Sequence, residues 1–196
     1  MKKVLVSGLF ALIILMTACK KDSPASATNI EGTYNFKLMS VKGSTSILGS
    51  SGDKAVTVSD FSSINNGGTV VFNNGTITAQ AFTYTVDTTA MLYLYDGDDV
   101  IASSSYPFSY TIPASNSVGQ YKIVGADSIY FPQGGLTVNI DGTGPYETVG
   151  NGGHFSFSGN LLTITENVTK DSTFEDSGET YHLVETATAS ILLEKK

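Results

Sequence analysis

The stretch Gly32-Thr33-Tyr34-Asn35-Phe36-Lys37-Leu38 alternates polar and apolar side chains. In a β-strand successive side chains point to opposite faces, so Tyr34, Phe36 and Leu38 would share one face and the polar residues the other. This pattern is typical of a strand with one face in a core and the other in water. The stretch therefore predicts the first strand of an antiparallel sheet.

The residues that follow predict an interruption of the sheet. Residues 43–53 are rich in serine and glycine and predict a loop, and residues 54–58 predict a short strand. Residues 59–64 fit a single helical turn, which would place Phe61 and Ile64 side by side.

Two hairpins are expected next. Asn73-Asn74-Gly75 separates two β-rich runs, and Asn-Gly tolerates the positive φ angles that a type I′ turn requires. The apolar face of the returning strand changes sides near Ala81, which predicts a β-bulge there. A second hairpin turns at residues 96–99, and Pro107 in its second arm marks an edge or a bulge because proline cannot donate a ladder hydrogen bond.

The C-terminal half predicts more strands around a glycine-rich excursion. The excursion covers residues 132–153, and a tight turn at Gly159-Asn160 follows it. The strands expected here are residues 118–124, 128–131, 154–158, 161–174 and 180–193. The sequence therefore predicts an all-β domain over residues 30–196, as an antiparallel up-and-down barrel of about eight to ten strands or, alternatively, a Greek-key β-sandwich.

The N-terminus predicts a secretory signal peptide over residues 1–18. Two lysines precede an apolar run of 13 residues, Val4–Met16, which is too short to cross a ~30 Å hydrocarbon core. The segment Leu15-Met16-Thr17-Ala18-Cys19 resembles the lipobox of bacterial lipoprotein precursors, which implies cleavage between Ala18 and Cys19 and lipid attachment to Cys19. Residues 19–29, rich in Ser, Ala and Thr, would form a flexible tether.

Charge and cysteine content limit the partners. The full chain has 11 lysines, and cleavage of the predicted leader would remove two of them. The mature chain would then have nine lysines, no arginine and 18 acidic residues, which is a formal charge of −9. Nucleic acid is a poor partner for such a surface. The single cysteine excludes an internal disulfide and fits a lipidated residue. We expect a lipid-anchored protein of the cell envelope, in the outer membrane, with its periplasmic or outward orientation open.

Three stretches resemble the small lipocalin-like domains of bacterial lipoproteins. These are residues 32–34 in the first strand, residues 72–76 in one hairpin and residues 159–164 in another, and the spacing covers residues 30–194. Tyr34 stands where that family usually has tryptophan. The resemblance implies a barrel that could bind a small apolar ligand. Its candidate lining residues are Tyr34, Phe36, Phe108 and Tyr110, although the sequence favours plain core packing over a lining role for each of them.

The alternative is a solid barrel with a structural or adhesive role, in contact with other envelope proteins. Other candidate sites are weaker. Asp96-Gly97-Asp98-Asp99 could attract Ca²⁺ but lacks the EF-hand spacing, and His154 with His182 could bind zinc only if the fold joined them to carboxylates. Glu166 and Glu185 could form an acid–base pair only if they faced the same space.

No sequence motif of a hydrolase, nucleotide-binding protein, metalloprotease or dithiol enzyme occurs in the chain. We therefore expect no enzyme, no cofactor, and no catalytic or metal-binding residue.

Overall fold

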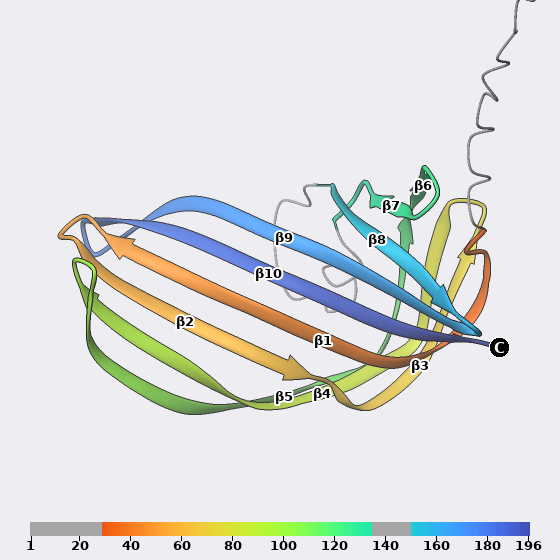
Figure 1. The fold of residues 1–196 in the computed structure, drawn as a ribbon, viewed down its shortest axis with the longest axis horizontal. Helices are drawn as coiled ribbons and strands as arrows, with labels where there is room; N and C mark the ends of the chain where they lie inside the picture. Colours follow the sequence, from red (N-terminus) through yellow and green to blue (C-terminus); the bar gives the residue numbers. More distant parts are fainter. Residues whose placement is uncertain (1–28, 135–149) are drawn as a thin grey trace, which may run out of the picture.

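The computed structural model describes residues 29–134 and 150–196, in which every regular element is a β-strand (Figure 1). The strands are β1 (Gly32–Gly49), β2 (Asp53–Ser62), β3 (Ile64–Asn73), β4 (Thr76–Asp96), β5 (Asp99–Gln120), β6 (Lys122–Val124), β7 (Ser128–Phe131), β8 (Asn151–Ser158), β9 (Leu161–Asp176) and β10 (Glu179–Lys195). The predicted leader, Cys19, most of the tether and the middle of the glycine-rich excursion lie outside the described residues.

All ten strands belong to one antiparallel sheet, which confirms the predicted fold class. β1 pairs with β2 and β3, these two pair with β4, and β4 pairs with β5. β6 to β10 then pair in chain order, and β10 returns to β1. β5 and β6 are not paired with each other, but only Tyr121 separates them along the chain. The sheet is therefore barrel-like, without a ladder that closes it between these two strands.

One end of this sheet is closed around a single packed core. Aromatic rings fill it: Phe36 stacks on Phe82 with centroids 4.2 Å apart, and Phe72 meets Tyr121 edge to face at 5.2 Å. Pairs of this kind each add about 1 kcal/mol beyond the burial of their area. Aliphatic side chains from β3, β7, β9 and β10 complete the core; Val70, Ile129, Leu162 and Leu193 are all essentially buried. We call this part of the molecule the closed end.

The closed end is bent by irregularities in the strands. The register of β1 against β10 shifts between Phe36 and Leu38, so Met39 rather than Leu38 enters the core. The expectation that Leu38 shares a face with Phe36 was therefore wrong, because the sequence pattern assumed an unbroken pleat. The bulge predicted near Ala81 is confirmed: Ala81 has a φ of 48°, and the β4–β5 register shifts between Ala79 and Phe82.

Two other local predictions were wrong. Residues 59–64 form no helical turn; β2 ends at Ser62 and β3 begins at Ile64, with Phe61 packed on the core and Ile64 exposed. Residues 43–49 are part of β1 and not a loop, since each pairs with both β2 and β10 up to Leu48. Polar side chains are tolerated there because that part of the strand lies outside the core, and Ser44 and Thr186 instead share a hydrogen bond of 3.1 Å.

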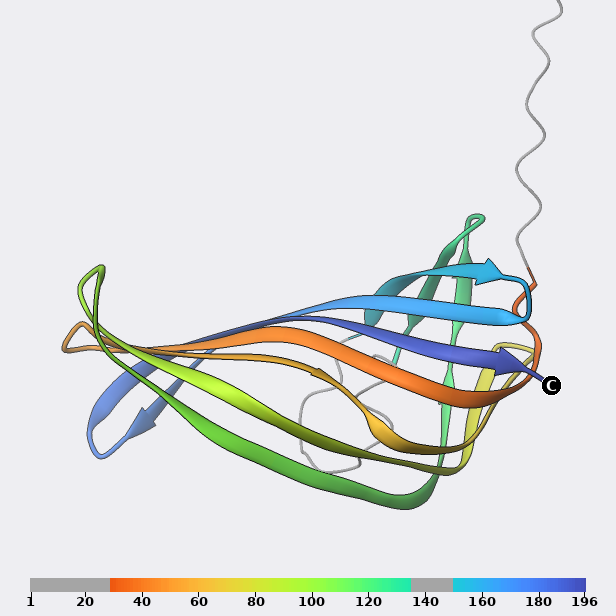
Figure 2. The same ribbon diagram turned by 60° about the horizontal axis from the view of Figure 1, so that its bottom comes forward.

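Six strands continue past the closed end as a sheet with no second layer. In Figures 1 and 2 the strands β1, β2, β4, β5, β9 and β10 run on to the left, and their three hairpin tips gather at that end. We call residues 44–58, 91–105 and 168–186 the extension. The start of β1 and the C-terminus lie at the opposite, closed end.

The glycine at position 68 gives a test of the β3–β4 bend. It has a φ of +99°, and a Cβ there would lie 2.6 Å from the Ala81 carbonyl oxygen and 2.7 Å from that of Gln80. We expect Gly68→Ala to lower the free energy of unfolding by more than about 2 kcal/mol. Two costs add: the backbone strain of an alanine at positive φ, and the clash of its Cβ with two carbonyl oxygens. Guanidinium unfolding of the purified protein measures this.

Gly52→Ala is the matched control. Gly52 has a similar φ of +96° but nothing within 4 Å of the added Cβ, so only backbone strain of about 1 kcal/mol is expected. Equal losses in the two variants would contradict the close approach of β3 and β4 at Gly68.

Candidate functional site

The four aromatic residues predicted to line a ligand cavity lie in two different environments. Tyr34 and Phe36 are buried in the packed core, where Tyr34 meets Phe72 edge to face with centroids 5.8 Å apart. The Tyr34 hydroxyl donates a hydrogen bond of 2.8 Å to the Ile30 carbonyl. Their surroundings are those of core residues, with protein atoms filling the space around the rings.

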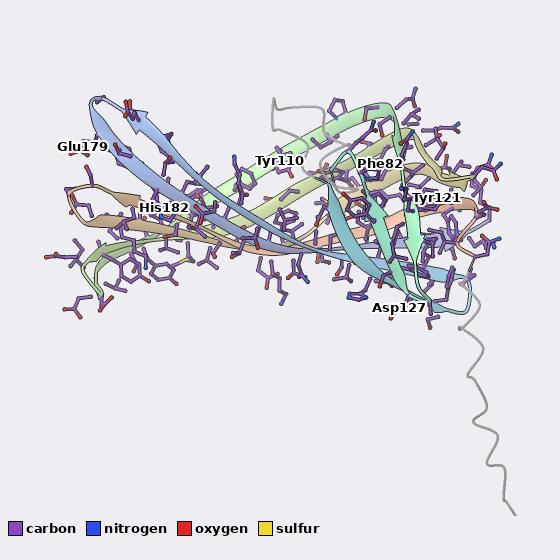
Figure 3. All side chains as sticks on the ribbon, turned by 90° about the horizontal axis from the view of Figure 1, so that it is seen from above. Phe82, Tyr110, Tyr121, Asp127, Glu179 and His182 are labelled. Carbon is purple, nitrogen blue, oxygen red and sulfur yellow. The ribbon has the colours of Figure 1, made fainter. Side chains whose placement is uncertain are left out.

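Phe108 and Tyr110 lie on β5 where the closed end opens toward the extension. Tyr110 packs on Tyr84 at 6.2 Å and is partly buried, while Phe108 is 42% exposed. Their rings are 5.2 Å apart. Figure 3 shows Tyr110 between the labelled core residues Phe82 and Tyr121 and the labelled far-end residues His182 and Glu179.

Two hollows occur on the outside of the described sheet. One, of about 430 Å³, lies over β1, β10 and β9 and is lined by polar side chains such as Lys42, Asn167 and Thr188. The other, of about 340 Å³, lies beside the Asn73-Asn74 turn. None of their lining residues belongs to the core cluster, so neither is an opening into the core.

The histidines lie far apart in the sheet. His154 on β8 is 3.3 Å from the Ser128 hydroxyl, and His182 on β10 is 2.6 Å from an Asp171 carboxylate oxygen on the extension. Residues 29–134 and 150–196 contain no group of three or more His, Cys, Asp or Glu side chains that could hold a metal ion.

Glu166 and Glu185 do not form a pair. Glu166 is only 2% exposed, next to Asn151, whose amide nitrogen is 3.5 Å from its carboxylate. Glu185 lies on the extension opposite Lys170, with which it is paired in register. The sequence predicts an outward or rim-facing Glu166, because carboxylates are rarely fully buried. The structure instead continues the inward alternation of Leu162 and Ile164 to Glu166.

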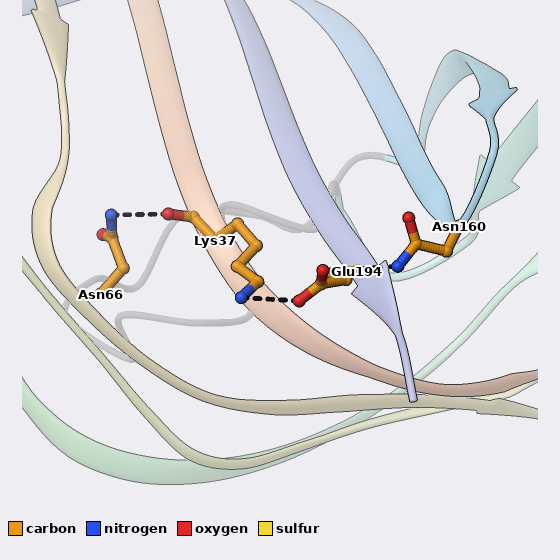
Figure 4. Close-up of polar contacts among 4 residues, drawn as sticks. All are labelled: Lys37, Asn66, Asn160 and Glu194. Carbon is orange, nitrogen blue, oxygen red and sulfur yellow. Dashed lines mark hydrogen bonds and ion pairs between the residues drawn. The ribbon is translucent and has the colours of Figure 1, made fainter.

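A polar clamp on the outer surface ties β1 to β10 and to the β8–β9 turn (Figure 4). Lys37 Nζ is 2.6 Å from one carboxylate oxygen of Glu194. The other carboxylate oxygen of Glu194 accepts a hydrogen bond of 3.3 Å from the Asn160 side chain. Lys37 holds the pKa of Glu194 below its usual value, so this pairing is present above that value and is lost as the pH falls. Asn66 donates to the Lys37 carbonyl at 2.8 Å, next to the β1 bulge.

The extension is the feature that the sequence prediction missed. Large apolar residues are exposed on both of its faces: Leu94 is 39% and Phe174 is 41% exposed on the face continuous with the core, and Leu48 is 40% and Val58 is 41% exposed on the other. These side chains have no place in the core cluster, so burial in the core does not explain them.

The three tips of the extension bring carboxylates together. Asp53 pairs in register with Asp96, Asp96 pairs with Asp99, and Asp176 pairs with Glu179. Like charges directly opposite each other destabilise a sheet, so this arrangement is not explained by stability. The Asp96–Asp99 turn predicted from the sequence is one of these tips.

Strand length could have indicated the extension. β1, β4, β5 and β10 contain 18, 21, 22 and 17 residues. Strands usually have about five or six residues, and a small barrel does not use strands of about 20. The sequence predicts most of these strands in separate pieces. It does not indicate that β1 continues past Gly43 or that β4 continues through residues 87–90.

Comparison of the chain with known protein families, curated proteins and solved structures found no match. The described residues include no helix of the length and apolarity needed to cross a membrane.

The Tyr34 hydroxyl provides a test of the core. Burial raises its pKa above the usual value of 10.0, so its contribution to stability is complete below that pH and is lost as the pH rises above it. We expect Tyr34→Phe to cost about 1–2 kcal/mol at neutral pH, through the lost hydrogen bond, and to reduce the loss of stability above pH 10.

Guanidinium unfolding at several pH values measures both effects. Tyr106→Phe, at a ring that is 39% exposed, is the control and should leave the free energy of unfolding at neutral pH unchanged. An unchanged alkaline profile in Tyr34→Phe would contradict the burial of this hydroxyl.

Proposed function

We propose that this chain is a lipid-anchored protein of the cell envelope that holds another envelope component on its extension. In this proposal the closed end is a solid support and catalysis plays no part. The observation that carries it is the extension itself, six strands that leave the core and expose apolar side chains on both faces.

The position at which the sheet begins supports this assignment. β1 begins at the closed end, where Tyr34 pairs with Lys195, and the three tips gather at the other end of the long strands (Figure 1). A lipid on Cys19 would therefore be attached, through the tether, to the end opposite the tips. The extension would then point away from the membrane, where another component can reach it.

A second candidate is a small apolar ligand held near Phe108 and Tyr110. The half-exposed rings at the opening of the closed end favour it. The filled core around Tyr34 and Phe36 favours the first proposal, because ligand sites usually occupy ~300 to 1,000 Å³. Native mass spectrometry of the protein purified from its own envelope separates the two: a co-purifying small apolar molecule would support the second.

Cys19→Ala tests the anchor. We expect the wild-type chain to incorporate a labelled fatty acid, to lose residues 1–18 and to stay with membranes after an alkaline wash. The variant has no thiol to modify, so it should incorporate no label and keep its leader. Ser23→Ala is the matched control and should behave as wild type. A Cys19→Ala protein that is processed and partitions with membranes like wild type would overturn the anchor.

Photo-crosslinking in intact cells tests the extension. A photoreactive phenylalanine at Leu94, on the extension, should form a covalent adduct with another envelope component. The same group at Phe157, which is 37% exposed at the closed end, is the matched control. Adducts from Phe157 but none from Leu94 would contradict the proposed binding surface.

A further inference from the structure

We propose that the inner face of the extension, the face continuous with the core, docks a cationic polypeptide segment that also carries apolar side chains. This inference rests on the proposed function and names the partner of that same surface.

The inner face carries an apolar row that crosses five strands. The cross-strand registers place Ala102 opposite Leu94, Leu94 opposite Ala55, Ala55 opposite Ile47 and Ile47 opposite Leu183. Ile47 and Leu183 are half-buried, and Leu94 is exposed. No described residue outside this sheet covers the row, so a partner with apolar side chains would remove it from water.

An aromatic pair adjoins the row at the tip. Phe174 and Tyr181 face each other across β9 and β10, with their rings stacked at 5.3 Å and an interplanar angle of 18°. Phe174 is 41% exposed. The exposed face of such a ring attracts a guanidinium or ammonium group.

Carboxylates surround this aromatic pair. The Tyr181 hydroxyl donates a hydrogen bond of 2.9 Å to Glu179, and Glu179, Asp176 and Asp53 together raise the pKa of Tyr181. A basic side chain placed over the ring would therefore also meet negative charge from three carboxylates on two hairpin tips. Figure 3 shows Glu179 at the far end of the molecule from Asp127 and Tyr121.

The distribution of charge decides between possible occupants. The extension contains nine acidic residues and two lysines, whereas the other described residues contain six acidic residues and five lysines. A second copy docked face to face would bring two such acidic surfaces together, and an anionic membrane would be repelled. A small inorganic cation is disfavoured because no cluster suited to a metal occurs in the described residues. A cationic polypeptide satisfies both the charge and the apolar row.

Three peptides of equal length test the proposal: alternating Lys and Val, alternating Glu and Val, and alternating Lys and Ser. Each carries a fluorescent label and is titrated against the protein in zwitterionic nanodiscs, with empty nanodiscs as the blank. We expect the Lys/Val peptide to bind at least about tenfold more tightly than the other two, and its binding to weaken as salt is raised.

Paired variants locate the site. Phe174→Ser, and separately Asp176→Asn with Glu179→Gln, should weaken binding of the Lys/Val peptide by about tenfold. Two control variants make the same kinds of change at the closed end: Phe157→Ser, and Glu31→Gln with Asp127→Asn. Both should bind the Lys/Val peptide with an affinity within about twofold of wild type. Circular dichroism and the thermal midpoint show whether each variant is folded, and Phe174→Tyr, which keeps an aromatic ring, should bind as wild type.

Several results would overturn the proposal. These are equal binding of the Glu/Val peptide, no effect of Phe174→Ser in a folded variant, or a dimer in sedimentation that Phe174→Ser dissociates. Photo-crosslinking from Leu94 in intact cells tests the proposed function separately. An adduct from Leu94 without binding of the Lys/Val peptide would show that the extension binds a partner but that the partner is not cationic. The absence of both the adduct and the peptide binding would show that the extension is not a binding surface.

Discussion

The shape of the molecule depends on the junction between Met39 and Ser63. The Met39 amide donates to the Ser63 hydroxyl at 2.8 Å, and the Ser63 amide donates to the Met39 carbonyl at 2.7 Å. Ser63 is buried and separates β2 from β3, beside the register shift in β1. Bulges add twist and allow a sheet to coil, and those of β1, β3 and β4 occur together here. On this side of the junction the sheet closes around the core.

On the other side the same strands continue with an unbroken pairing pattern until the shift at Leu94 and Tyr95 near the tip. Without bulges the sheet is not forced to curl back on itself, so the extension stays a single layer with both faces in water. One set of strands therefore provides a stable, packed end and an exposed surface. Most of the negative charge of the described residues lies on the exposed half.

Sequence reasoning predicted the features that are set by local chemistry. The Asn74-Gly75 turn, the bulge at Ala81 and the final pair of long strands follow from turn residues and alternation, and the structure confirms them. It failed where distant pairing decides the outcome. Ser and Thr in residues 43–49 suggest a loop, yet β10 and β2 hold them in a strand. The candidate site was missed for the same reason, because tips that are distant in sequence, such as Asp53 and Asp176, meet only in the folded sheet.

Each long strand has a packed half and an exposed half, and hydrogen exchange along single strands tests this division most directly. Amides of β4 between Ile77 and Val86, in the core, should exchange far more slowly than those between Met91 and Tyr95. β10 should show the same gradient, with slow exchange near Ile191 and faster exchange near Leu183. Uniform protection along both strands would mean that the extension is covered or packed, and would contradict the division into a packed and an exposed half.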